Sequence, residues 1–120
     1  MANPFVHVEL NTTDIPKAKA FYESLFGWQI EDVPMPSGTY TMIHVGEGTG
    51  GGITQQPVAG APSEWLAYVL VDDIAAATEK ARSLGAVVMR DVTEIPGAGW
   101  LSIIVDPTGA RLGLWKPSAS

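Results

Sequence analysis

The spacing of apolar and polar positions predicts a strand followed by an amphipathic helix at the start of the chain. Residues 5–10 alternate between two kinds of side chain, as a strand with two different faces does. Asp14 is a favourable helix N-cap, Pro16 fits the first turn, and Gly27 supplies a left-handed stop. The apolar positions between them recur every three or four residues and share one helical face: Ala18, Phe21, Tyr22, Leu25 and Phe26.

Three more strands are predicted in the first half of the chain. They cover residues 28–33, residues 40–45 and the stretch around Ile53. Residues 34–38, rich in proline, and residues 46–52, rich in glycine, separate them. The first half therefore reads as strand, helix and three strands.

The second half of the chain repeats this order. A strand at residues 65–71 leads to Asp72 and Asp73, which cap a helix that Gly85 ends. The apolar positions of this helix are Ile74, Ala77, Ala81 and Leu84. Three strands follow, at residues 86–90, 100–105 and 111–115, with turns at residues 96–99 and 106–109 between them.

The two halves align at a nearly constant offset. Asp73 lies 59 residues after Asp14, and Leu84 lies 59 residues after Leu25. We therefore expect an α+β fold of two βαβββ modules. Module one covers about residues 4–55, a linker covers residues 56–63, and module two covers about residues 64–117. Modules of this size are too small to fold separately, so they should share a core within a single domain of residues 1–120.

Each predicted strand separates into two faces, because successive side chains point to opposite sides. In the first strand Val6, Val8 and Leu10 form an aliphatic face that suits a helix, and His7 and Glu9 belong to the other face. The same split sets apart a second group that mixes aromatic and polar side chains: Tyr40, Met42, His44, Trp100, Arg111 and Trp115. Apolar walls with a few polar groups are typical of a concave small-molecule site. The alternative is that this mixed face is simply exposed to solvent.

Composition and charge exclude several classes of function. The chain has 13 acidic and 7 basic residues, a net charge of −6, and its cations are scattered, so we expect neither nucleic acid nor a membrane as a partner. Without cysteine there is no disulfide, thiolate zinc site or thiol nucleophile. The start of the chain shows no export signal and no apolar run is long enough to cross a bilayer, which favours a soluble cytoplasmic protein.

Short motifs along residues 5–116 together resemble the vicinal oxygen chelate superfamily, the group of glyoxalases, bleomycin-resistance proteins and extradiol dioxygenases. These motifs are His7-Val8-Glu9-Leu10, Thr13-Asp14, Phe21-Tyr22, Leu25-Phe26-Gly27-Trp28, Val71-Asp72-Asp73 and Asp106-Pro107-Thr108-Gly109. The resemblance implies paired βαβββ modules with curled mixed sheets that enclose a cavity, the glyoxalase/bleomycin-resistance-like fold, and, usually, a homodimer.

The resemblance also implies where a metal would bind, with one ligand from the first strand and one from the last strand of each module. His7 stands at the first of these positions, whereas Leu66 and Gly113 stand at two others and offer no donor. Near the end of module one the chain has Gly51, Gly52 and Ile53, with Gln55 as the nearest donor. One ligand of four is too few, since a catalytic metal needs about three protein groups. We therefore expect no cofactor, and a non-standard divalent metal site of His7, Glu9 and His44 stays open as the alternative.

We expect a homodimeric small-molecule-binding protein of this superfamily without the usual metal. The expected walls of the ligand site are Tyr40, Met42, Leu66, Tyr68, Trp100 and Trp115, and the expected polar anchors are His7, Glu9, His44 and Arg111. Trp65 covers an edge in this interpretation. A lyase or isomerase of the glyoxalase type, with His7 and Glu9 as acid and base, is the first alternative. An antibiotic-sequestering protein is the second, and a structural Glu9 held by Arg111 or Tyr68 remains open.

Overall fold

A computed structural model describes residues 3–36 and 38–118, and Ser37 of the predicted turn at residues 34–38 lies outside the described residues. The chain divides into two compact units, His7–Leu66 and residues 67–118 with residues 3–6. The boundaries fall inside the first and fifth strands, so the expected linker at residues 56–63 belongs to the first unit.

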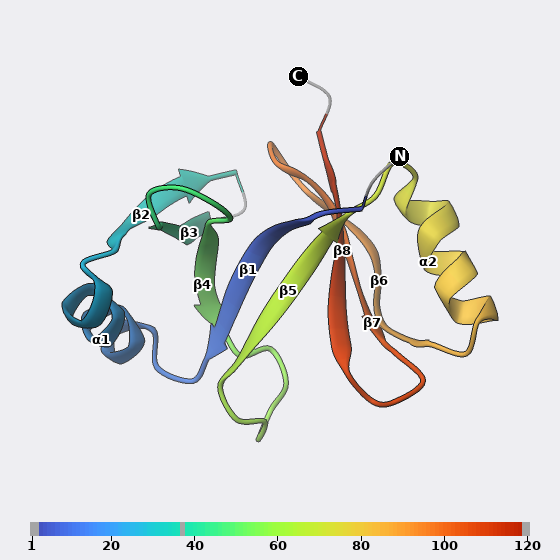
Figure 1. Ribbon diagram of the computed structural model, residues 1–120, viewed down its shortest axis with the longest axis horizontal. Helices are drawn as coiled ribbons and strands as arrows, with labels where there is room; N and C mark the ends of the chain where they lie inside the picture. The colour runs from blue at the N-terminus through green and yellow to red at the C-terminus, as the bar shows by residue number, and fades with distance from the viewer. Residues whose placement is uncertain (1–2, 37, 119–120) are drawn as a thin grey trace. The chain divides into compact units, whose positions relative to one another are not determined.

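The order of elements is βαβββ twice, as the sequence predicts (Figure 1). The first repeat contains β1 (Phe5–Thr12), α1 (Ile15–Phe26), β2 (Gln29–Met35), β3 (Gly38–His44) and β4 (Gly51–Gln55). The second repeat contains β5 (Glu64–Leu70), α2 (Ile74–Ser83), β6 (Val87–Ile95), β7 (Gly99–Val105) and β8 (Arg111–Pro117).

Both repeats have the same strand order, β2-β3-β4-β1 in the first and β6-β7-β8-β5 in the second. In each, the first strand pairs parallel with the last, and the remaining neighbours pair antiparallel. The α+β class and the two βαβββ modules are therefore confirmed.

Both helices begin where the sequence predicts. Asp14 accepts a hydrogen bond from the Lys17 N–H at 3.1 Å, and Asp73 accepts one from the Ala76 N–H at 3.0 Å. Gly27 ends α1 with a φ of 67°, a left-handed conformation that glycine adopts without strain. The prediction that Leu84 belongs to α2 is wrong, because the helix ends at Ser83 and Leu84 is its exposed C-cap.

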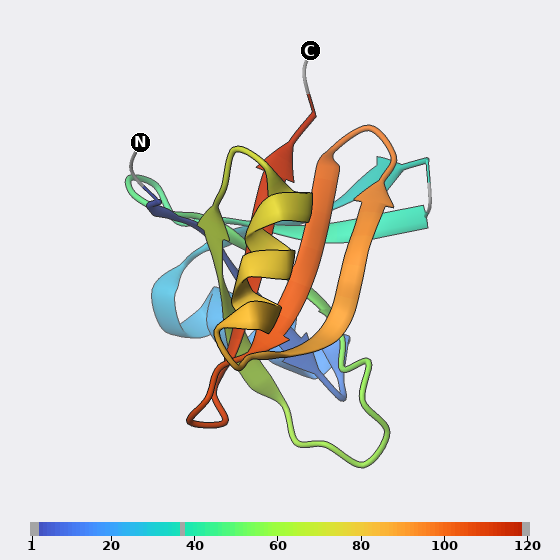
Figure 2. The same ribbon diagram turned by 90° about the vertical axis from the view of Figure 1, so that its right-hand side faces the viewer.

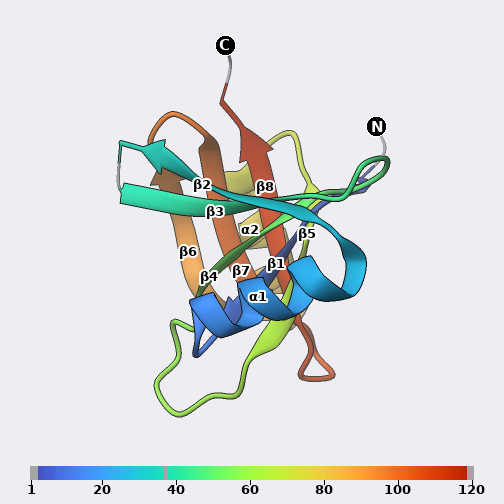
Figure 3. The same cartoon turned by 90° about the vertical axis from the view of Figure 1, so that its left-hand side faces the viewer.

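The helix α1 covers a small core in the first unit (Figure 3). Ile15, Ala18 and Tyr22 pack against a buried cluster formed by Leu10, Ile30, Ile43 and Ile53. The rest of the predicted apolar face, Phe21, Leu25 and Phe26, is more than half exposed. The apolar stripe of α1 is thus wider than the core beneath it.

In the second unit, α2 lies across one face of β6, β7 and β8 (Figure 2). Thr78 of α2 and Ser102 of β7 are buried there, with their hydroxyl oxygens 2.9 Å apart. Ser102 and Leu114 are direct partners across β7 and β8, so both belong to the face that α2 covers.

Two strands extend beyond their predicted ends. β2 continues through Pro34 to Met35, and proline is compatible with this place because β2 is the last strand in its order and has a strand on one side only. β6 reaches Ile95, and its pairing with β7 is irregular between Val88 and Thr93. In the described residues no helix is long and apolar enough to cross a membrane.

Candidate functional site

The first repeat brings three polar side chains together on the face of its sheet opposite α1. The register aligns Glu9 of β1, Gly52 of β4 and Met42 of β3 in one row. His7 lies two residues before Glu9, and Tyr40 lies two residues before Met42, so all four side chains share this face. The predicted grouping of these residues on the mixed face agrees with the register.

Tyr40 connects His7 and Glu9 through hydrogen bonds. Its hydroxyl group donates to Oε2 of Glu9 at 2.7 Å, and Nε2 of His7 lies 2.9 Å from the same hydroxyl oxygen. A phenol has one proton, and Tyr40 uses it in the hydrogen bond to Glu9, so His7 donates its Nε2–H to the tyrosine oxygen. We call this hydrogen-bonded row His7–Tyr40–Glu9 the polar row.

Burial lowers the pKa of His7 below its usual value of 6.5, because the charged imidazolium loses hydration. At neutral pH the ring is therefore uncharged. Its Nε2 carries the proton, and its Nδ1 carries the lone pair that can accept a proton. The polar row holds this tautomer and fixes the orientation of the ring.

A glycine makes the polar row possible. A Cβ atom at Gly52 would overlap the hydroxyl oxygen and the ring of Tyr40, so the ring crosses β4 only because this position has no side chain. The second repeat contains a similar contact, in which a Cβ at Gly113 of β8 would overlap the ring of Tyr68 of β5. Gly52 pairs with Glu9 and Gly113 pairs with Tyr68, so the two glycines hold equivalent places in the two repeats.

The residues at the four expected ligand positions do not fit a resident metal ion. Only His7 supplies a donor. Leu66 and Gly113 stand at two of the other positions, and among Gly51, Gly52 and Ile53 the register makes Gly52 the equivalent of Gly113. At Gly52 and Gly113, tyrosine rings fill the space that a ligand side chain would need. The proton on Nε2 of His7 further removes the lone pair that would face a metal at this point.

His44 contacts a different partner from the one that the metal alternative requires. Its Nε2 lies 2.8 Å from Oε1 of Glu31 in an exposed pair across β2 and β3. Within residues 3–36 and 38–118, no three His, Cys, Asp or Glu side chains are placed to hold a metal ion. The structure therefore does not bring His44 together with His7 and Glu9.

The second repeat places the other predicted walls on two faces. Tyr68, Arg111 and Trp115 share one face, and Leu66 and Tyr68 are buried. Trp100 pairs with Lys116, whose Nζ lies 4.8 Å from the ring centroid, and therefore lies on the opposite face from Trp115. The prediction that Trp100 and Trp115 line one cavity is wrong. Alternation shows that each strand has two faces, but it does not show which faces of neighbouring strands match.

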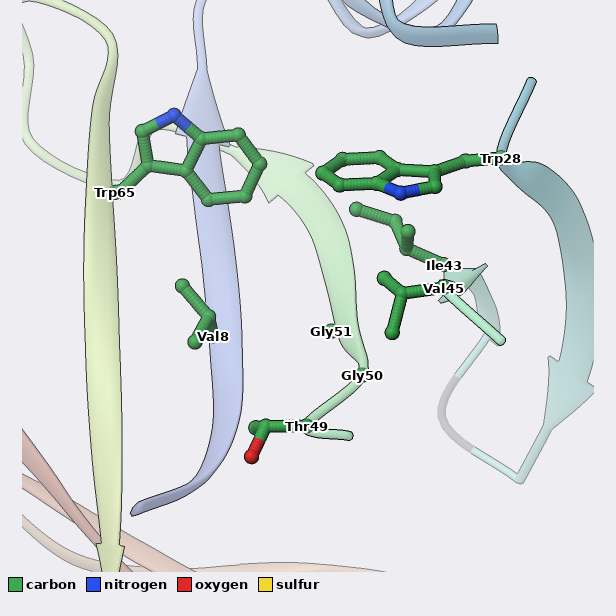
Figure 4. A pocket seen from close by; sticks show the side chains of 8 residues that line it. All are labelled: Val8, Trp28, Ile43, Val45, Thr49, Gly50, Gly51 and Trp65. Carbon is green, nitrogen blue, oxygen red and sulfur yellow. The ribbon is translucent and has the colours of Figure 1, made fainter. Parts of the chain in front are cut away.

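A pocket of about 270 Å³ in the first unit was not predicted. Trp28, which follows α1, and Trp65 of β5 point toward each other across it, and Val8, Ile43 and Val45 lie beneath the two rings (Figure 4). Tyr22 packs edge-on against Trp65, with ring centroids 5.4 Å apart. The lining belongs to the aliphatic face, so the sequence pattern identifies it as core; the two tryptophans are the signal that could have revealed it.

Comparison with known proteins identifies the family. Residues 5–114 match the family described as the Glyoxalase/Bleomycin resistance protein/Dioxygenase superfamily. The chain belongs to this superfamily, as its motifs suggested.

Individual relatives agree with this assignment. The chain is 43% identical over 114 residues to "Putative glyoxylase CFP32" of Mycobacterium bovis, an alignment that covers 91% of this chain and 44% of that protein. It is 24% identical to the anthracycline biosynthesis protein DnrV of Streptomyces peucetius, with 90% and 45% covered. The chain thus spans less than half the length of these curated relatives.

Among solved structures, methylmalonyl-CoA epimerase from Mycobacterium tuberculosis has a similar fold. The TM-score is 0.69 at 15% sequence identity, and the match covers 96% of this chain and 88% of the epimerase. This similarity supports the fold.

Proposed function

We propose that the protein binds a small organic molecule on the face that carries His7, Tyr40 and Glu9, without the divalent metal of the superfamily. The polar row is the observation that carries this proposal. Its three side chains are half-buried and held in place by each other, so a ligand would meet polar groups that are already oriented.

The surroundings of the polar row favour a partly apolar, planar ligand with at least one hydroxyl group, because the protons of the row are already used within it. Met42 lies on the same face, and the ring of Tyr40 offers a flat surface beside the hydroxyl group. Arg111, Trp115, Leu66 and Tyr68, the wall and anchor residues expected from the second repeat, remain expectations from the sequence. DnrV is named for anthracycline biosynthesis, so an anthracycline is a reasonable first probe.

Calorimetric titration of the protein with an anthracycline measures the binding affinity and tests this proposal. We expect His7→Ala to weaken binding about tenfold, because a ligand hydroxyl group that donates to Nδ1 of His7 loses this partner and the row loses its order. His44→Ala is the matched control, since His44 is an exposed histidine that pairs with Glu31. Equal affinities of the two variants for the anthracycline, or no binding of it by the wild type, would contradict the proposal.

Proton transfer is the second candidate function, and the state of His7 favours it. A neutral imidazole whose Nδ1 can accept a proton, linked through Tyr40 to a carboxylate, is suited to remove a proton next to a carbonyl group. Incubation with a bound ketone in deuterium oxide would then label the carbon next to the carbonyl. Loss of labelling in His7→Ala with binding retained indicates this role, and binding without any turnover indicates sequestration.

The homodimer expected from the resemblance remains a prediction. Light scattering of the purified chain should give about twice the mass of 12.7 kDa. A mass of one chain at micromolar concentration would contradict it.

A further inference from the structure

Two side chains that commonly bind metals face a single point in the first repeat. Nε2 of His7 and Oε2 of Glu9 lie 2.9 Å and 2.7 Å from the hydroxyl oxygen of Tyr40. An imidazole nitrogen and a carboxylate oxygen that converge in this way are two of the donors that a divalent ion uses. A hydroxyl oxygen stands at the point of convergence.

We propose that the hydroxyl group of Tyr40 takes the place of a divalent metal ion between His7 and Glu9, and that Gly52 lacks a side chain so that the tyrosine ring can reach this place. The ring starts from β3, crosses β4 over Gly52 and ends at β1. A ligand side chain at position 52 and the ring of Tyr40 exclude each other, since a Cβ there overlaps the phenol.

The hydroxyl group satisfies both neighbours as a metal ion would, and the contact with His7 is the one that differs. It accepts a hydrogen bond from Nε2–H of the imidazole and donates one to the carboxylate, whereas a metal would accept lone pairs from both. The row therefore needs no cation to hold His7 and Glu9 in one orientation. Removal of the phenol would leave two donors, one fewer than the roughly three that a catalytic metal site requires.

The second repeat supports this inference independently. Gly113 holds the place equivalent to Gly52, and it too is covered by a tyrosine ring, that of Tyr68. Tyr68 reaches Gly113 from the first strand of its repeat, whereas Tyr40 reaches Gly52 from the third. Two different tyrosines thus fill the same position above a glycine.

This inference concerns the side chains on which the proposed function rests, but its test does not involve an organic ligand. Stability and metal binding are measured instead. Failure of the inference is therefore distinguishable from failure of the proposed function, which is judged by ligand affinity.

A double-mutant cycle on stability tests the contact between Gly52 and Tyr40. We expect Gly52→Ala to lower the melting temperature by about 5–15 °C in the wild-type background, because the added methyl group overlaps the phenol. In the Tyr40→Ala background, Gly52→Ala should lower the melting temperature by less than half of that amount. A fold that is lost in Gly52→Ala and restored in Tyr40→Ala/Gly52→Ala supports the inference equally, and equal shifts in both backgrounds overturn it.

Gly51 provides the matched control, because it is the neighbouring buried glycine of the same strand. A Cβ at Gly51 would overlap the backbone carbonyl of Val8 and would not meet Tyr40. Gly51→Ala should therefore destabilise the wild type and Tyr40→Ala by the same amount. If Tyr40→Ala relieves Gly51→Ala as well, the relief is a general loosening of the sheet, and the inference is overturned.

Metal binding is the second test, with Ni²⁺ as the probe and protein without a histidine tag. Calorimetry should show no stoichiometric Ni²⁺ binding by the wild type. The double variant Tyr40→Ala/Gly52→Asp removes the ring and adds a third donor. It should bind one Ni²⁺ at least tenfold more tightly than the wild type does, and a further His7→Ala change should abolish this gain in affinity. Stoichiometric wild-type binding that depends on His7, or no gain in the double variant, overturns the inference.

Discussion

The two repeats have the same fold but different chemistry at the same positions. In the first repeat Glu9 pairs with Gly52, which lies under the ring of Tyr40. This tyrosine is half-buried and forms hydrogen bonds with His7 and with the carboxylate of Glu9. In the second repeat the equivalent place of Glu9 is held by Tyr68, which is only 3% exposed and lies over Gly113.

The difference shows how one βαβββ unit can be specialised for packing while its duplicate keeps polar groups. A tyrosine covers the last-strand glycine in both cases, so the glycine alone does not distinguish a site from a core. The neighbours distinguish them, since Leu66 stands at the place of His7. Burial of Tyr68 contributes mainly to stability, whereas Tyr40 also orders two titratable groups.

The largest effect is expected from truncation of the two tyrosines. Tyr68→Ala should reduce the free energy of unfolding by about 3–5 kcal/mol, because it empties a buried space of aromatic size. Tyr40→Ala should reduce it by about 2 kcal/mol, since its ring is partly exposed and less contact area is lost. Urea denaturation of both variants measures the difference.

A larger loss of unfolding free energy for Tyr40→Ala than for Tyr68→Ala would contradict the view that Tyr68 serves mainly packing and Tyr40 mainly the site. Tyr40→Phe sharpens it further. This change keeps the ring over Gly52 but removes the hydroxyl group, so most of the stability should remain while the fixed Nε2–H tautomer of His7 is lost, as ¹⁵N chemical shifts would show.

A smaller effect is expected from the buried hydroxyl pair of the second repeat. Thr78 donates to the carbonyl of Ile74 at 2.7 Å and lies 2.9 Å from Ser102, and the exposed fractions of the two residues are 1% and 0%. Thr78→Val keeps the shape but removes a hydrogen-bonding partner from Ser102, so it should cost about 1–2 kcal/mol. Thermal unfolding measures this loss.

The double variant Thr78→Val/Ser102→Ala is the control for this pair. Because both hydroxyl groups are then absent, no buried hydroxyl lacks its partner, and part of the stability should return. If the two single losses simply add, the pair makes no specific contribution. The polar row of the first repeat differs because its members are only half-buried and remain within reach of a ligand.

The sequence predicts the elements well because local signals determine them. Asp14, Asp73 and Gly27 mark helix ends through backbone hydrogen bonds and conformation that involve only nearby residues. Strand ends are less certain. β2 runs through Pro34 because of its place in the strand order, which no local pattern reveals.

The candidate site could be predicted only in part. Alternation places His7 and Glu9 on one face of their strand, and the mixed aromatic and polar composition groups Tyr40 with them, in agreement with the register. It does not reveal that Trp100 faces away from Trp115, since that depends on the pairing of β7 with β8. The sequence also could not predict that the ring of Tyr40 crosses over Gly52, because this contact depends on the side-chain rotamer of Tyr40 as well as on the strand register.

The smallest effect concerns the charge of His7 and acts through pH. Because burial lowers its pKa in the folded state below 6.5, the unfolded chain binds a proton more readily. This contribution to stability is complete above pH 6.5 and is lost as the pH falls through the folded-state pKa. The wild type should therefore lose stability relative to His7→Gln between pH 7 and 5, measured by urea denaturation at each pH.

Comparison with His44→Gln isolates this effect, because His44 is an exposed histidine of the same repeat. Two influences on His7 oppose each other. Burial disfavours its charged form, and the carboxylate of Glu9, on the far side of the Tyr40 hydroxyl, favours it. A wild type that gains stability over His7→Gln on acidification would show that Glu9 prevails. The polar row would then hold an imidazolium at the lower pH, and the His7 ring would be an acid rather than a base.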